Sequence, residues 1–161
     1  MIQFRWFPLN KLISLFQKIQ IHPLFWFIIA IGILTASFKE LILLFSIVII
    51  HEMGHVTAAH FFSWRIKKIM LLPFGGVVEL DEHGNRPFKE ELIVIIAGPI
   101  QHVWMIALSF ILNYFQLISG ELHQLFLFHN LVILCFNLLP IWPLDGGKCI
   151  FLYLTSKMPF Q

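Results

Sequence analysis

The stretch LILLFSIVIIHEMGHVTAAHFF, residues 41–62, places two histidines and a glutamate in an otherwise strongly apolar run. A helix needs about 20 predominantly apolar residues to cross the hydrocarbon core of a bilayer. Ionisable side chains inside such a helix are costly, so they indicate a function and a partner close by. The stretch therefore predicts a membrane span that carries chemistry.

The composition of the whole chain excludes an ordinary soluble domain. Of its 161 residues, 58% are hydrophobic and 12% are charged, and the mean hydropathy is +0.83. Soluble domains carry about 25% charged residues. We expect one membrane-embedded domain over residues 1–161, an all-α polytopic fold with four transmembrane helices and the start of a fifth. The predicted spans are 22–38, 41–62, 92–115 and 122–142, and a short helix begins near Lys148.

The basic residues predict the orientation in the cell membrane. They precede the first span, separate the second from the third, and follow the fourth, whereas only Lys39 falls on the other side. The residues on the majority side are Arg5, Lys11, Lys18, Arg65, Lys67, Lys68, Arg86, Lys89, Lys148 and Lys157. Because cytoplasmic loops are rich in lysine and arginine, we expect a cytoplasmic N-terminus. The sequence contains no nucleic-acid-binding patch, and the expected surroundings are the lipid bilayer.

The pattern HEMGH, residues 51–55, has the spacing of a metal site. Residues four apart share one face of a helix, so His51 and His55 can direct their imidazoles at one point. In the H-E-x-x-H arrangement the histidines hold Zn²⁺ and the glutamate, here Glu52, handles the protons of a water molecule. The alternative is a set of polar residues that hydrogen-bond to neighbouring helices inside the bundle.

A catalytic zinc ion needs a third protein ligand. One candidate is Asp145 in NLLPIWPLDGG, residues 137–147, where Pro140 and Pro143 prevent a regular helix. Broken backbone at membrane depth persists only where protein buries it or a water-filled cavity adjoins it. The second and fourth spans end on the same side, so Asp145 can reach the histidines; the alternative is an Asp-Gly turn outside the membrane. The other candidate ligands are Glu79, Glu82, Glu90 and Glu91.

These motifs together resemble the site-2 protease family of intramembrane zinc metalloproteases. HEMGH followed two spans later by NLLPIWPLDGG carries the resemblance, and LLPFGGVVELDEHGNRP (71–87) with IIAGPIQH (95–102) narrows it to the sporulation group of that family. The resemblance implies that His51, His55 and Asp145 bind one Zn²⁺ and that Glu52 is the catalytic acid/base. It also implies a membrane-associated sporulation pro-sigma factor as substrate and inhibitory membrane proteins as partners.

The segment GGVVEL, residues 75–80, predicts a short strand after a glycine turn. The resemblance implies a membrane-dipping β-hairpin between spans two and three, whose edge would hold an extended substrate through main-chain hydrogen bonds. A surface hairpin on the cytoplasmic leaflet is the alternative. The resemblance also implies that Asn137 contacts substrate or the reacting carbonyl, and a helix–helix hydrogen bond is the alternative. The candidate substrate-binding residues are Phe74, Gly75, Gly76, Val77, Val78, Asn137 and Pro143.

Members of the sporulation group are similar in having six spans and a cytoplasmic nucleotide-sensing CBS domain. The resemblance therefore implies C-terminal spans and a CBS domain that these 161 residues do not include. Two other functions fit the motifs. One is an H-E-x-x-H membrane protease of another type with a glutamate as third ligand, and the other is a non-catalytic membrane protein that binds or transports zinc.

Overall fold

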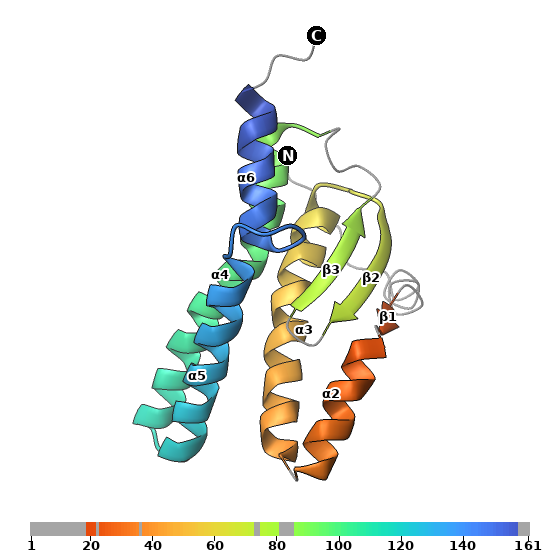
Figure 1. The fold of residues 1–161 in the computed structure, drawn as a ribbon. Coiled ribbons are helices and arrows are strands. Elements are labelled where there is room, and N and C mark those ends of the chain that lie inside the picture. Colours follow the sequence, from red (N-terminus) through yellow and green to blue (C-terminus); the bar gives the residue numbers. More distant parts are fainter. Residues whose placement is uncertain (1–18, 22, 36, 73–74, 81–85, 158–161) are drawn as a thin grey trace.

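The structure of the protein, a computed structural model, describes residues 19–21, 23–35, 37–72, 75–80 and 86–157. A small sheet lies beside a group of helices (Figure 1). The elements in chain order are β1 (Ile19–Ile21), α2 (Pro23–Leu34), α3 (Phe38–Phe61), β2 (Ile66–Leu72), β3 (Gly75–Leu80), α4 (Phe88–Tyr114), α5 (Gly120–Asn137) and α6 (Asp145–Lys157).

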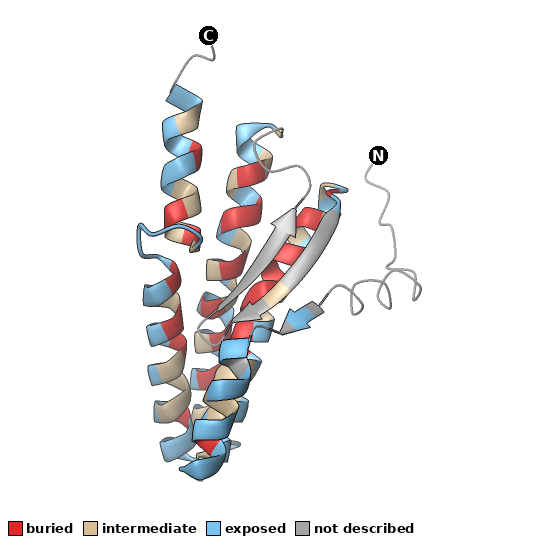
Figure 2. Ribbon diagram, turned by 45° about the vertical axis from the view of Figure 1, so that its right-hand side comes forward, coloured by how far each residue is buried: buried red, intermediate tan, exposed pale blue. Residues whose placement is uncertain are grey.

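Helices α3 and α4 pack side by side at the centre of the fold. Their buried residues recur every three or four positions, which places them on one face of each helix. Gly54 permits the close approach, because a Cβ at this position would overlap the carbonyl group of Ala97 on α4. Helix α5 packs against both, and Figure 2 shows the buried residues gathered on the inner faces of the helices.

The three strands form one sheet in the order β1-β2-β3. β1 pairs in parallel with β2, and β2 pairs antiparallel with β3 in a hairpin between α3 and α4. β3 packs against α3 and is an edge strand, so one row of its main-chain groups has no strand neighbour in the described part of the sheet. That open edge lies on the side of the sheet nearer α4 and α6 (Figures 1 and 2).

The prediction of four transmembrane helices is wrong, because only α3 and α4 among the described residues are long and apolar enough to cross a membrane. α2 has 12 residues and spans about 18 Å, well short of a bilayer core. α5 ends at Asn137, before the prolines, and polar residues interrupt its apolar sequence. These residues are Glu121, His123, Gln124, His129 and Asn130.

The prediction of an all-α fold is also wrong, because a three-stranded sheet lies beside the helices, whereas strands were expected only in a hairpin between spans two and three. Its strand β1 was not expected at all, because Ile19–Ile21 gives no alternating pattern longer than three residues. Parallel pairing of this segment with β2 depends on tertiary contact rather than on local sequence. The fold is therefore a mixed one in which a small sheet flanks the helices.

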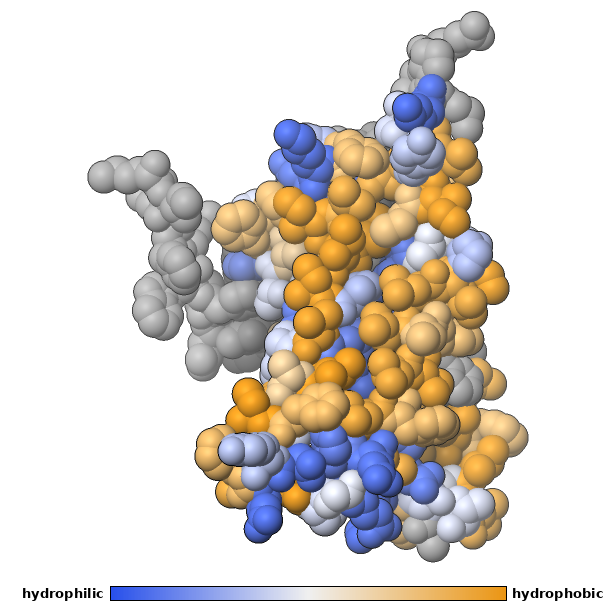
Figure 3. All heavy atoms as spheres, turned by 90° about the vertical axis from the view of Figure 1, so that its left-hand side faces the viewer, coloured by the Kyte–Doolittle hydropathy of each residue, from blue (hydrophilic) through white to orange (hydrophobic). Residues whose placement is uncertain are grey.

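Large apolar side chains cover the outside of the helices. Trp26, Phe27, Val103 and Phe128 are each more than half exposed. Figure 3 shows apolar side chains over the face formed by α4, α5 and α6, with hydrophilic ones gathered at the end where α4 joins α5. An apolar surface of this extent marks contact with a membrane or another protein.

Candidate metal centre

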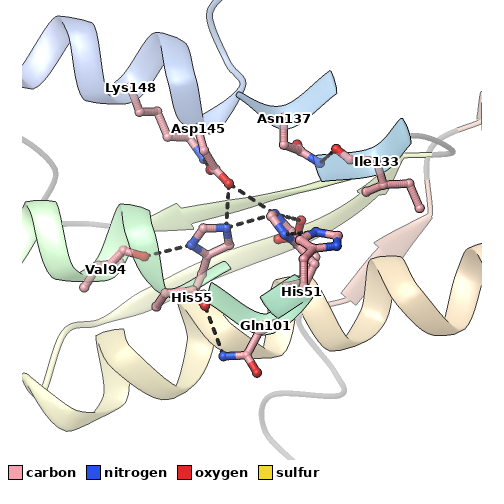
Figure 4. Close-up of polar contacts among 11 residues, drawn as sticks. His51, His55, Val94, Gln101, Ile133, Asn137, Asp145 and Lys148 are labelled. Carbon is pink, nitrogen blue, oxygen red and sulfur yellow. Dashed lines mark hydrogen bonds and ion pairs between the residues drawn. The ribbon is translucent and has the colours of Figure 1, made fainter. Parts of the chain in front are cut away.

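Three buried side chains from two helices meet at one point (Figure 4). His51 and His55 come from α3, and Asp145 is the first residue of α6. Asp145 Oδ2 lies 3.1 Å from His51 Nε2 and 3.2 Å from His55 Nε2, and the two Nε2 atoms are 3.2 Å apart. The three atoms thus form a nearly equilateral triangle.

The size of this triangle suits a tetrahedral metal ion. Zinc bonds of about 2.0–2.1 Å to nitrogen and oxygen place neighbouring ligand atoms about 3.3 Å apart, close to the observed separations. His51, His55 and Asp145 are at most 5% exposed. Asp145 Oδ2 is buried without a hydrogen-bond partner in the described part of the chain. Electron-rich atoms held this close repel one another unless a proton or a metal cation lies between them.

The backbone determines the tautomer of His55. Its Nδ1 lies 2.8 Å from the Val94 carbonyl oxygen on α4, and a carbonyl only accepts hydrogen bonds. Nδ1 therefore donates, which leaves the Nε2 lone pair of the neutral imidazole directed at the centre of the triangle. A metal-ligating histidine is commonly oriented in this way.

Lys148 holds the other oxygen of Asp145. Its Nζ lies 3.3 Å from Asp145 Oδ1, one turn along α6, so the contact leaves Oδ2 directed at the histidines. The nearby Lys148 ammonium favours the charged form of the Asp145 carboxyl group. The carboxylate is therefore ionised, as a metal ligand must be.

Glu52 lies beside the triangle without entering it. It follows His51 directly on α3, is buried, and its Oε1 is 3.9 Å from His51 Nε2. The Glu52 carboxylate therefore lies next to the metal position. Glu52 can therefore exchange protons with a water molecule there, which is what a general acid/base requires.

Gly98 on α4 is a site residue that the sequence reasoning missed. A Cβ at this position would overlap Nε2 and Cε1 of His55 and would crowd Cε1 of His51. Gly98 lies directly before Pro99 in IIAGPIQH, a motif that the sequence analysis used for the family resemblance and not for the site. Gly98 supplies the space in which both imidazoles turn toward Asp145.

Two apolar clusters enclose this polar layer along the helices. One contains Val56, Ala59, Trp64 and Val94, and the other contains Ile47, Val48, Met105 and Ile133. Residues 51–55 lie between the two clusters in the sequence of α3. Water is therefore excluded above and below the triangle, which strengthens electrostatic interactions within it.

The candidate substrate residues are only partly described. Asn137 is buried at the end of α5, where its Nδ2 donates to the Ile133 carbonyl of its own helix. The predicted strand residues lie in β3, whose side chains are not described, and Pro143 is exposed in the segment before α6. Phe74 lies outside the described residues.

The alternative glutamate ligands have other surroundings. Glu90 Oε2 accepts a hydrogen bond from Trp64 Nε1, and Glu91 Oε1 accepts one from the backbone N–H of Arg86. The side chain of Glu79 and all of Glu82 lie outside what the structure describes. Asp145 is the carboxylate for which the structure shows contact with both histidines.

A comparison with protein families matches residues 39–120 to the model of peptidase family M50. A solved structure, the site-2 protease from Methanocaldococcus jannaschii, superimposes with a TM-score of 0.74 at 30% identity, covering 88% of this chain and 69% of that one. The chain belongs to peptidase family M50. This M50 chain is accordingly a membrane-embedded protein, consistent with its two candidate spans and apolar exterior.

Curated relatives of this M50 chain carry similar names. Stage IV sporulation protein FB of Bacillus subtilis is 54% identical over 153 residues, which cover 95% of this chain and 53% of that protein. A zinc metalloprotease of Methanocaldococcus jannaschii is 39% identical over 120 residues, or 72% of this chain and 34% of that protein. The M50 chain thus spans about half the length of the first relative and about a third of the second.

Proposed function

We propose that this chain is the core of an intramembrane zinc metalloprotease that hydrolyses a peptide bond of a membrane-associated protein. The observation that carries the proposal is the triangle of His51 Nε2, His55 Nε2 and Asp145 Oδ2 with Glu52 beside it. Two imidazoles and one carboxylate would leave one position of a tetrahedral zinc ion for water, and Glu52 lies beside them, which is typical of a catalytic rather than a structural zinc site.

Zinc in this triangle would supply a Lewis acid that acidifies water and polarises the scissile carbonyl. Glu52 takes a proton from the attacking water as the oxygen–carbon bond forms. When the carbon–nitrogen bond breaks, Glu52 returns that proton to the leaving amine. His51, His55 and Asp145 keep their positions through both steps, because they are buried and belong to the helices α3 and α6.

The open edge of β3 suits an extended substrate. A helical segment hides its carbonyl groups in internal hydrogen bonds, so it must unwind before hydrolysis. β3 offers main-chain donors and acceptors on the side of the sheet nearer α4 and α6, and a peptide can add to such an edge. In this proposal Gly75, Gly76, Val77 and Val78 supply that edge, and Asn137 contributes its amide oxygen, because its Nδ2 is bonded to Ile133.

The substrate class is proposed from similarity. A relative that is 54% identical is named a sporulation protein, which supports a sporulation pro-sigma factor as substrate and inhibitory membrane proteins as regulators. Basic residues support a cytoplasmic location for the N-terminus and for the end of the fold where α3 and α6 finish. At that end lie Arg65, Arg86, Lys89 and Lys157, whereas Lys39 lies at the opposite end.

The test is cleavage of a membrane-tethered pro-sigma factor from a spore-forming bacterium by the full chain in lipid vesicles. Wild type should bind about one zinc ion and cleave, and Glu52→Gln should keep the zinc but lose cleavage. Glu121→Gln is a matched control, since Glu121 is exposed at the far end of α5. Cleavage by Glu52→Gln at the wild-type rate would refute the proposal, and so would a zinc-loaded wild type that cleaves no membrane-tethered protein.

A further inference from the structure

A buried chain of hydrogen bonds leads away from His51 through two residues that the proposed reaction does not use. His51 Nδ1 lies 3.0 Å from His102 Nε2, and His102 Nδ1 lies 2.9 Å from Asn130 Oδ1. The three side chains come from α3, α4 and α5, and none is more than 1% exposed. Solvent does not reach these groups, so their hydrogen-bond partners must come from the protein.

Metal binding at His51 fixes which atom donates and which accepts in each of these hydrogen bonds. A neutral imidazole has one N–H and one lone pair. If His51 Nε2 offers its lone pair to a cation, His51 Nδ1 carries the hydrogen and donates to His102 Nε2. The hydrogen of His102 must then be on Nδ1, where it donates to an acceptor. Asn130 Oδ1 is that acceptor.

The reverse direction would disable His51 as a ligand. An Asn130 amide turned by 180° would present its NH₂ group to His102 Nδ1, so His102 would donate from Nε2 to His51 Nδ1. His51 Nε2 would then carry a hydrogen pointed at the triangle. In the structure Asn130 Nδ2 points elsewhere and is buried with no hydrogen-bond partner among the described residues. An amide left in this costly state is held for the sake of its oxygen.

We propose that His102 and Asn130 are positioning residues that hold His51 in the tautomer with a free Nε2 lone pair and so raise the affinity of the centre for zinc. The proposal rests on the proposed zinc-dependent function. His55 needs no such side chains, because the Val94 carbonyl sets its tautomer directly. The hydrogen bonds from His51 to His102 and from His102 to Asn130 are called the relay below. The relay joins α3, α4 and α5, so it also couples the metal position to the packing of all three helices.

The test measures the dissociation constant for zinc by chelator competition on the purified full chain. His102→Leu removes the acceptor for His51 Nδ1–H and should weaken zinc binding by about 10- to 100-fold, the range for groups behind metal ligands. His102→Gln places an amide oxygen near the former Nε2 position and should restore most of the affinity. The Co²⁺-loaded forms report ligand geometry, so the visible bands should change in His102→Leu and return toward wild type in His102→Gln.

His123→Leu is the matched control, because His123 is also a buried histidine but contacts the ring of Phe110, away from the relay. It should bind zinc as wild type does. Unchanged affinity in folded His102→Leu would overturn the proposal. Equal losses in His102→Leu and His102→Gln would also overturn it, because the effect would then come from packing rather than from the accepted hydrogen bond.

Asn130→Leu provides an independent measurement should His102→Leu fail to fold. Asn130 acts through His102, so Asn130→Leu should weaken zinc binding less than His102→Leu, and the double variant should be no weaker than His102→Leu alone. Additive losses would contradict the relay. Failure of the relay and failure of the zinc site give different results. A wild type that binds neither Zn²⁺ nor Co²⁺ refutes the zinc site itself. A wild type that binds metal, with relay variants that bind it equally well, refutes only the relay.

Discussion

His51 Nε2 and His55 Nε2 lie 3.2 Å apart, and both face Asp145 Oδ2, although this aspartate follows them by 94 and 90 positions in the sequence. Helix periodicity accounts for the histidine pair. The aspartate reaches them because the segment after α5 ends where α6 begins against α4. The metal centre therefore depends on the tertiary fold, and a substitution that moves any of the three ligands should weaken metal binding.

Asp145→Asn keeps the volume of the side chain but removes its negative charge. We expect zinc affinity to fall by more than about 100-fold, beyond the range for groups behind the ligands. Glu121→Gln, the same carboxylate-to-amide change at an exposed position, should leave affinity unaltered. Chelator competition on both variants measures the difference. Retention of wild-type affinity in Asp145→Asn would show that a different carboxylate completes the site.

Gly98→Ala should damage the centre without touching a ligand. The added methyl group would overlap His55 and crowd His51, so the imidazoles must rotate or α4 must shift away from α3. We expect lost zinc binding in a folded protein. Gly120→Ala is the matched control, since a Cβ there meets nothing within 4 Å. Equal zinc content in the two purified variants would contradict the role of Gly98.

Zinc should stabilise the folded chain through mass action. At a free concentration 100 times the dissociation constant, a ligand that binds only the folded state adds about 2.7 kcal/mol, which corresponds to roughly 5–10 °C in Tm for a domain of this size. Thermal unfolding of chelator-treated protein in detergent, with and without added zinc, measures this shift. The shift should vanish in Asp145→Asn, and a shift of the same size in that variant would be evidence for zinc binding elsewhere.

Trp64→Phe tests the contact that closes the end of α3 against α4. Trp64 is buried and its Nε1 donates to Glu90 Oε2 at 3.1 Å. Loss of this bond should lower the free energy of unfolding by about 1–2 kcal/mol, because the acceptor is charged and partly buried. Trp104→Phe is the control, since Trp104 is 44% exposed and bonds to Gln101 on its own helix. If both variants lose equal stability, the Trp64 contact has no special weight.

The sequence predicted the parts of the site that depend on local spacing. The spacing of His51, Glu52 and His55 follows from helix geometry. Asp145 was expected near the histidines from a fourth span that the structure does not support, and it begins α6 rather than preceding a helix near Lys148. The sequence did not predict the roles of Gly98, His102 and Asn130. A glycine and two polar residues stand out in apolar helices, but helix packing determines which side chains they contact, and the sequence alone does not show this packing.

The number of spans was wrong because apolar length alone does not define a helix. The run over 22–38 contains a helix that stops at Leu34, and the run over 122–142 stops at Asn137 before Pro140. Polar residues on α5, including His123 and Asn130, are buried against the other helices.

The proposed function depends on one cation that is held by His51, His55 and Asp145. Zinc K-edge X-ray absorption on the purified, zinc-loaded full chain tests it most directly. The expected first shell has two imidazole nitrogens with further oxygen ligands at about 2.0–2.2 Å, and it should lose order in Asp145→Asn while Glu52→Gln leaves the imidazole contribution intact. A first shell without imidazole, or one identical in wild type and Asp145→Asn, would contradict the account.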